Sequence, residues 1–217
     1  MPTARVAPDL EMHYRVDDYA EYVDGRARAD GTRAFLASRG ITLPEGSSGD
    51  PAGADTVEGL SERKDEIFRR RLAEDGVAPY PDAVRYLREV RAAGLRTAVV
   101  SASRHCAQIV AAAGLTDLFD TRVDGVDAAR ERLHGKPAPD TFLAAAKRLN
   151  TIPAQAAVFE DAIAGVAAGR AGRFGQVVGV DRTAASGRTP HGDGLREHGA
   201  DVVVHDLAEL LDSGGAA

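Results

Sequence analysis

Short apolar runs alternate with helical patterns from residue 80 to the end of this chain, and this alternation limits the possible folds more than any other feature. The expected strands are 95–100, 121–124, 156–159, 176–180 and 202–204. The expected helices are 81–93, 104–113, 139–149, 162–171 and 207–211. Continuous apolar runs of this length indicate parallel strands that are covered on both faces. The sequence therefore predicts an α/β fold with a doubly wound, Rossmann-like parallel sheet.

The part of the chain before this pattern has a different texture. Residues 1–15 show no periodicity and are expected to be loose. Residues 16–79 predict a small helical domain, in which one helix ends at Gly40 and the segment 44–54 forms a Gly-, Pro- and Ser-rich surface loop. A second helix is expected over 55–74, with four apolar residues facing inward: Val57, Leu60, Ile67 and Leu72. Three regions follow from this reading: 1–15, 16–79 and 80–217.

Composition and charge argue against several classes of protein. The formal net charge of -6 leaves no basic stripe for nucleic acid. No apolar run approaches the roughly 18 residues of a membrane span, and the N-terminus does not resemble a signal peptide, so we expect a cytoplasmic protein. The single cysteine, Cys106, excludes an internal disulfide. Its apolar, helical surroundings favour a buried structural thiol over a nucleophile. We expect a monomer or a weak dimer.

Adjacent carboxylates follow one of the predicted strands. In a doubly wound sheet, ligands bind beyond the carboxyl ends of the strands. Glu160 and Asp161 come directly after the strand 156–159. Two neighbouring carboxylates repel each other unless a cation lies close by, and Mg²⁺ favours such oxygen ligands. An equally good alternative is that Asp161 only caps the following helix.

A lysine and a serine lie at two further positions of the same kind. Lys136 is held between a glycine and two prolines, which stiffen its loop and suit a fixed positive charge that meets a phosphate. The alternative is a solvated loop lysine. Ser101 follows the strand 95–100 and begins the run Ser101, Ala102, Ser103, Arg104, where a hydroxyl and free amides at a helix start form an anion site. For Ser103 alone, a helix cap is equally good.

Three segments together resemble the second, third and fourth motifs of the haloacid dehalogenase superfamily. These segments are 99–103 (VVSAS), 135–140 (GKPAPD) and 158–165 (VFEDAIAG). The Lys-Pro-Ala-Pro-Asp form and the helical insert before it resemble the branch of β-phosphoglucomutase and phosphoglycolate phosphatase, with its small helical cap. The resemblance covers residues 16–211.

The resemblance implies Mg²⁺-dependent phosphoryl transfer on a small phosphorylated sugar or metabolite. Ser101 and Lys136 would hold the transferring phosphoryl group, with Ala102, Ser103 and Arg104 beside it. Glu160 and Asp161 would hold Mg²⁺. In the cap, the segment 23–28 (VDGRAR) resembles one whose arginine grips the far phosphate of a sugar bisphosphate, a role that would fall to Arg28. The segment 62–64 (ERK) would supply a second cation, Lys64. The alternative for both residues is a solvated helix charge.

The first motif of that family, Asp-x-Asp-Gly after an apolar strand, does not occur in the sequence. No two aspartates are separated by one residue. In the family, the first aspartate is the nucleophile and the second is the general acid and base. We therefore expect the chain as written to be inactive or nearly so, through a misassigned start or a true loss. We also expect apolar edges on the strands that would flank the missing one.

Three functions remain open at this point. The mutase interpretation is favoured by Arg28 and Lys64, a pair suited to a second phosphate. A phosphatase of small phosphorylated metabolites shares every core residue, and a non-catalytic phosphosugar-binding relative fits the missing motif. A nucleotide-binding Rossmann domain is disfavoured, because the glycines at 165–175 lack the dinucleotide fingerprint.

Overall fold

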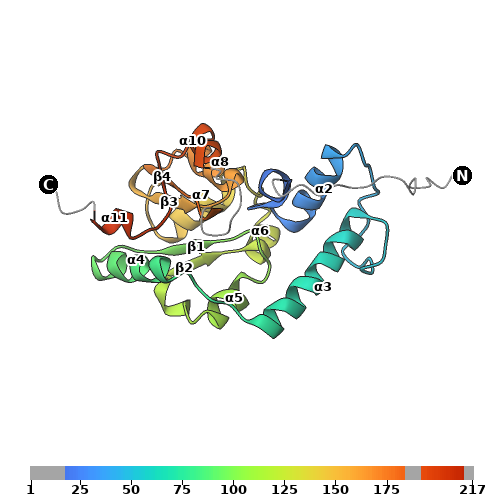
Figure 1. Ribbon diagram of the computed structural model, residues 1–217, viewed down its shortest axis with the longest axis horizontal. Helices are drawn as coiled ribbons and strands as arrows, with labels where there is room; N and C mark the ends of the chain where they lie inside the picture. The colour runs from blue at the N-terminus through green and yellow to red at the C-terminus, as the bar shows by residue number, and fades with distance from the viewer. Residues whose placement is uncertain (1–17, 184–191, 213–217) are drawn as a thin grey trace, which may run out of the picture.

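The computed structural model describes residues 18–183 and 192–212 and confirms the predicted α/β class (Figure 1). The expected loose segment 1–15 lies outside these residues. The first described part is helical, and Figure 1 shows α2 and α3 to one side of the strands. Its elements are η1 (Tyr19–Val23), α2 (Arg28–Ser38) and α3 (Val57–Asp75). The division of the chain between residues 79 and 80 remains a prediction.

Helix α3 begins and ends at residues that suit helix termini. The Thr56 hydroxyl accepts a hydrogen bond from the Gly59 amide at 2.9 Å, and Gly76 follows the last turn with a φ of 68°. The expected inner position Ile67 is wrong, because its side chain is 40% exposed. The buried residues of α3 all lie within its first two turns, and α3 packs against α2. The apolar residues further along the helix are therefore not fully covered by another element.

The second part contains the strands and the helices that cover them. The strands are β1 (Ala98–Val100), β2 (Thr121–Val123), β3 (Ala157–Glu160), β4 (Gln176–Val180) and β5 (Val202–Val204). The α-helices are α4 (Pro81–Ala92), α5 (Cys106–Ala112), α6 (Gly125–Glu131), α7 (Asp140–Arg148), α8 (Ile163–Ala171), α10 (Gly192–Glu197) and α11 (Glu209–Asp212). Two 3₁₀ turns, η2 (Thr116–Leu118) and η3 (Pro153–Gln155), lie between them.

Most expected elements are present, with three differences. The first strand is shorter than 95–100, since Leu95 is 60% exposed and the strand starts at Ala98. Helices α6 and α10 are absent from the sequence prediction. Helix α6 is a short helix that starts from a capping box, in which the Asp124 carboxylate accepts hydrogen bonds from the amides of Val126 (2.9 Å) and Asp127 (3.0 Å).

The strands form two parallel sheets, whereas the sequence predicts one. β1 pairs with β2, with Ala98 opposite Thr121. β3, β4 and β5 form the second sheet, with Ala157 opposite Gln176 and Val178 opposite Val202. Within the described residues, β1 and β3 do not pair with each other. The local hydrophobic pattern predicts each strand separately, but it does not indicate which strands, distant in the sequence, pair with each other.

The main core lies between the second sheet and helices α7, α8 and α10. It includes Phe142, Val158, Val166, Phe174 and Leu195. Helix α8 approaches the sheet closely at Gly169, where an added Cβ would meet Val158 and Val177 side chains at 3.2 Å. Cys106 is 3% exposed, and burial raises the pKa of its thiol, as expected for a structural cysteine. Among the described helices, none combines the length and hydropathy that a membrane crossing requires.

We expect replacement of Phe174 by alanine to destabilise the fold by about 3 kcal/mol, because it removes a buried ring and leaves a cavity. The Phe174 ring is 8% exposed and packs edge-on against Phe142, with 5.9 Å between ring centroids. The matched control is Ile152→Ala at a residue that is 58% exposed, where the change should stay within about 0.5 kcal/mol. Urea unfolding measures both, and equal losses for the two variants would contradict this description of the core.

Candidate functional site

Two connected cavities lie at the carboxyl ends of the strands. The first has a volume of about 520 Å³ and is lined by the predicted residues Ser101, Ala102, Ser103, Lys136, Glu160 and Asp161. The second has a volume of about 1210 Å³ and lies between the helical part and the strands. It is lined by the predicted residues Arg28, Lys64 and Arg104, and also by Ser101, Ala102, Ser103 and Lys136. The structure therefore brings all nine predicted site residues to the walls of this pair of cavities.

Lys136 and Glu160 form a buried ion pair at the base of the first cavity. The Lys136 ammonium contacts the Glu160 carboxylate, and the two residues are only 6% and 9% exposed. The same ammonium lies 4.8 Å from the centroid of the Phe142 ring. Burial raises the pKa of the Glu160 carboxyl, while the charge of Lys136 acts in the opposite direction. A solvated loop lysine does not describe Lys136.

Asp161 lines the same cavity directly after Glu160. The N-cap residue of α8 is Ala162, so Asp161 lies one residue before the N-cap position of this helix. The first turn of α8 passes very close to the Glu160 side chain. A Cβ added to Gly165 would overlap the Glu160 carboxyl group, so the glycine provides the space that this carboxylate occupies.

The loop after β1 is held by hydrogen bonds of its own hydroxyls. The Ser101 hydroxyl accepts from the Ser103 amide at 3.1 Å, and the Ser103 hydroxyl accepts from the His105 amide at 3.1 Å. The N-cap residue of α5 is His105, and the Ser103 hydroxyl bonds the amide of that residue, so Ser103 supports the turn directly before the helix. Gly125 supports the loop from the start of α6, because its amide donates to the Ser103 carbonyl at 3.1 Å.

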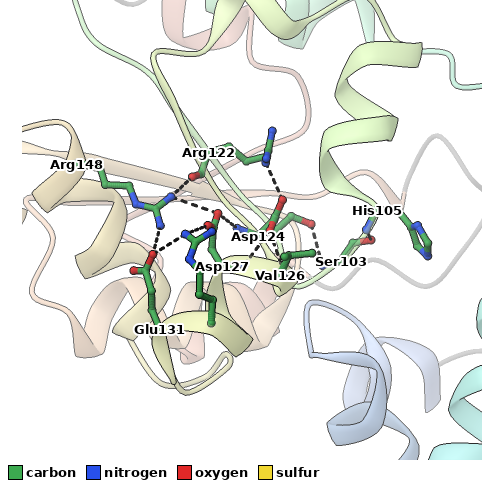
Figure 2. Close-up of polar contacts among 10 residues, drawn as sticks. Ser103, His105, Arg122, Asp124, Val126, Asp127, Glu131 and Arg148 are labelled. Atoms are coloured by element: carbon green, nitrogen blue, oxygen red, sulfur yellow. Dashed lines mark hydrogen bonds and ion pairs between the residues drawn. The ribbon is translucent and has the colours of Figure 1, made fainter. Parts of the chain in front are cut away.

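A charged network fixes the turn that supports this loop (Figure 2). Asp124, which is 2% exposed, accepts a hydrogen bond from the Arg122 guanidinium at 2.6 Å. The Arg148 guanidinium donates to the Asp127 and Glu131 carboxylates at 3.2 and 2.6 Å and also to the Arg122 carbonyl. The sequence analysis missed this network, although the two aspartates spaced three apart at 124 and 127 indicate a helix start.

The helical part meets the strand-bearing part at Asp65. The Arg28 guanidinium pairs with the Asp65 carboxylate at 3.2 Å, and the His105 ring contacts it at 3.0 Å. The His105 ring also stacks on Phe68, with 5.6 Å between centroids. Although burial acts to raise the pKa of Asp65, the hydrogen bond with His105 and the charge of Arg28 lower it. Arg28 is thus a paired residue rather than a solvated helix charge.

Lys64 lies on the same side of the larger cavity. Its ammonium is 5.4 Å from the centroid of the Tyr19 ring. Burial and the nearby charge of Arg28 both lower the pKa of the Lys64 ammonium. Its positive charge therefore lies in a partly desolvated position beside a second cation.

Within the described residues, four arginines that line the cavities were not predicted, and they are Arg26, Arg69, Arg132 and Arg182. Arg26 lines both cavities and lies inside the segment 23–28, of which only Arg28 was singled out. Arg182 lines the first cavity, where its guanidinium stacks on Tyr80 at 4.4 Å and pairs with Asp82 at 2.6 Å. The sequence indicated a loop rather than a site over 182–194, although Arg182 comes just after the predicted strand 176–180, at an edge where ligands bind in this fold.

Comparisons with known proteins agree with this geometry. A family model described as haloacid dehalogenase-like hydrolase matches residues 5–173. The β-phosphoglucomutase of Mycobacterium bovis is 53% identical over 194 residues, covering 89% of this chain and 73% of that protein. The fructose-1-phosphate phosphatase YqaB of Escherichia coli is 40% identical over 114 residues, covering 52% of this chain and 57% of that protein. A hydrolase from Pseudomonas syringae superposes with a TM-score of 0.71 at 23% identity, covering 90% of this chain and 82% of that structure, which supports the fold.

We expect Gly165→Ala to destabilise the protein by about 1–3 kcal/mol, because the new methyl group must displace the buried Glu160 carboxylate. Helix propensity alone would make the alanine variant more stable by about 1 kcal/mol. A loss of stability would therefore indicate the clash with Glu160. The matched control is Gly49→Ala, at a position where an added Cβ has open space. Urea unfolding measures both variants. An unchanged or stabilised Gly165→Ala protein would show that Glu160 is not confined as described.

Proposed function

This chain belongs to the haloacid dehalogenase-like hydrolase family, and on that basis we propose that it binds a phosphorylated sugar with Mg²⁺ in the manner of a β-phosphoglucomutase. The observation that carries the proposal is the gathering of a hydroxyl, an ammonium and two carboxylates on one cavity at the strand ends. Those groups are Ser101, Lys136, Glu160 and Asp161. The family match agrees with the resemblance that the three sequence motifs indicate.

The roles of these groups follow from their chemistry. The Ser101 hydroxyl and the Lys136 ammonium are donors suited to the oxygens of a phosphoryl group. Glu160 and Asp161 offer oxygen ligands in the number that Mg²⁺ commonly takes from a protein, with phosphate and water completing its shell. Within the described ranges, no cluster of three or more His, Cys, Asp or Glu side chains is placed to hold a metal. When bound, Mg²⁺ neutralises charge on the phosphoryl group.

The larger cavity favours a substrate that carries charge at both ends. Arg28, Lys64 and Arg104 line it, on the side away from Glu160 and Asp161. A second phosphate in this cavity would bring an acceptor to the Lys64 ammonium, which lies close to the like charge of Arg28. This arrangement supports a sugar bisphosphate, and with it the mutase interpretation over the phosphatase one.

A phosphatase of small phosphorylated metabolites is the second candidate. The similarity to a fructose-1-phosphate phosphatase favours it, and the same four core residues would serve it. Neither reaction can proceed through an aspartyl phosphate without a nucleophilic aspartate, and the sequence contains no Asp-x-Asp pair. We therefore assign binding of phosphosugar and Mg²⁺ to these 217 residues, and not turnover on their own.

Isothermal titration with glucose 6-phosphate in the presence of Mg²⁺ tests the binding proposal. We expect Ser101→Ala to weaken binding about 10-fold, because a hydrogen bond to a charged group is lost. Asp161→Asn should remove most of the dependence of this affinity on Mg²⁺. The control is Arg63→Ala, an exposed residue that lines neither cavity. Binding that is insensitive to both Ser101 and Asp161 would contradict the proposed site.

Hydrolysis of an aryl phosphate such as p-nitrophenyl phosphate, with Mg²⁺, tests the absence of turnover. We expect a rate at the level of the uncatalysed background, since the covalent step has no nucleophile. Lys136→Ala should leave that background unchanged. Robust hydrolysis that is lost in the Lys136 variant would show that another group in this chain carries the reaction.

A further inference from the structure

Three buried polar atoms in the described part of the chain lack a hydrogen-bond partner, and all three belong to residues that line the larger cavity. They are Arg26 Nε, Arg28 Nη1 and Thr141 Oγ1. Roughly 90% or more of buried polar groups in proteins have a partner, and each exception costs free energy. Because all three residues line the same cavity, we expect a polar ligand bound there to supply the missing hydrogen-bond partners.

Arg26 lies where the two cavities share their lining. Within the described part of the chain, Arg26 and Lys136 are the Lys and Arg residues that line both cavities. Lys136 is neutralised by Glu160, and Arg28 is paired with Asp65. Within the described ranges, no ion pair joins Arg26 to a carboxylate. Arg26 therefore supplies an uncompensated guanidinium where the two cavities meet.

The backbone around Arg26 is fixed against the strand end that carries the acidic pair. The preceding Gly25 has a φ of 70°, and a Cβ added there would lie 2.7 Å from the Ala162 side chain. The Arg26 amide donates to the Val23 carbonyl at 3.3 Å. This close approach holds the start of the Arg26 side chain at the junction of the cavities.

Thr141 adds a neutral group to the lining of the larger cavity. It lies in the first turn of α7 and is 4% exposed. A threonine hydroxyl both donates and accepts hydrogen bonds, whereas a guanidinium only donates. Sugar hydroxyls also do both, while an ionised phosphate oxygen only accepts. The Thr141 hydroxyl can therefore use both capacities with a sugar hydroxyl but only its donor capacity with a phosphate, and the Arg26 guanidinium can donate to the oxygens of the same sugar.

We propose that Arg26 and Thr141 bind the sugar hydroxyls of the phosphorylated substrate, between the positions that receive its two ends. This inference rests on the proposed function, because it takes the first cavity as the phosphoryl site. It assigns sugar recognition to two residues outside the three core motifs that hold the phosphoryl group and Mg²⁺.

Titrations with glucose 6-phosphate and with inorganic phosphate, both with Mg²⁺, test the role of Arg26. Arg26→Ala should raise the Kd for glucose 6-phosphate about 10-fold or more and the Kd for phosphate less than about 3-fold. Arg63→Ala removes the same charge outside both cavities and should change neither Kd. Equal weakening of both ligands, or no weakening of either, would overturn the assignment.

Thr141→Val provides an independent measurement. The variant removes a buried hydroxyl that has no partner, so the urea midpoint of the free protein should rise, while the affinity for glucose 6-phosphate falls and that for phosphate stays constant. An unchanged sugar affinity would exclude Thr141 from the site. If the wild type fails to bind glucose 6-phosphate, the proposed function and this inference both fall. If binding depends on Ser101 but not on Arg26, only the inference falls.

Discussion

The contact between Lys136 and Glu160 is the constraint on which the site depends. It joins the loop before α7 to the end of β3, and both side chains are shielded from water. Removing one partner of a buried ion pair leaves an uncompensated charge and costs about 3–5 kcal/mol, so each side chain fixes the place of the other. The space for this pair exists because position 165 carries no side chain. The first cavity takes its shape from these two conditions.

The helical part is attached to this site at two separate places. The segment before α2 presses Gly25 against Ala162, beside the acidic pair. Helix α3 reaches the start of α5 through Asp65 and His105. Gly25, Asp65 and His105 all line the larger cavity, so both contacts contribute to its shape. A ligand that fills the cavity is enclosed by elements that are far apart in the sequence.

Local patterns were sufficient to predict the strands and six of the residues that line the first cavity. Continuous apolar runs identified the strands, and the residues after them were at the expected edge. The inward position of Ile67 was wrong because periodicity selects a helix face but does not show that another element covers it. The split into two sheets depends on pairing between distant segments. The lack of a hydrogen-bond partner for Arg26 Nε and Thr141 Oγ1 depends on which residues surround them in the fold, so it cannot be predicted from a sequence motif.

The split of the strands into two sheets has a mechanical consequence. Ser101 follows the β1–β2 sheet, while Glu160 ends a strand of the other, and helix α7 contacts β1, β2 and α8. The two halves of the phosphoryl site are thus coupled through side-chain packing along α7 and not through a continuous ladder of backbone bonds. The relative position of Ser101 and Glu160 is therefore set by how α7 packs on both sheets, and a change in the side chains along α7 would alter both halves of the site together.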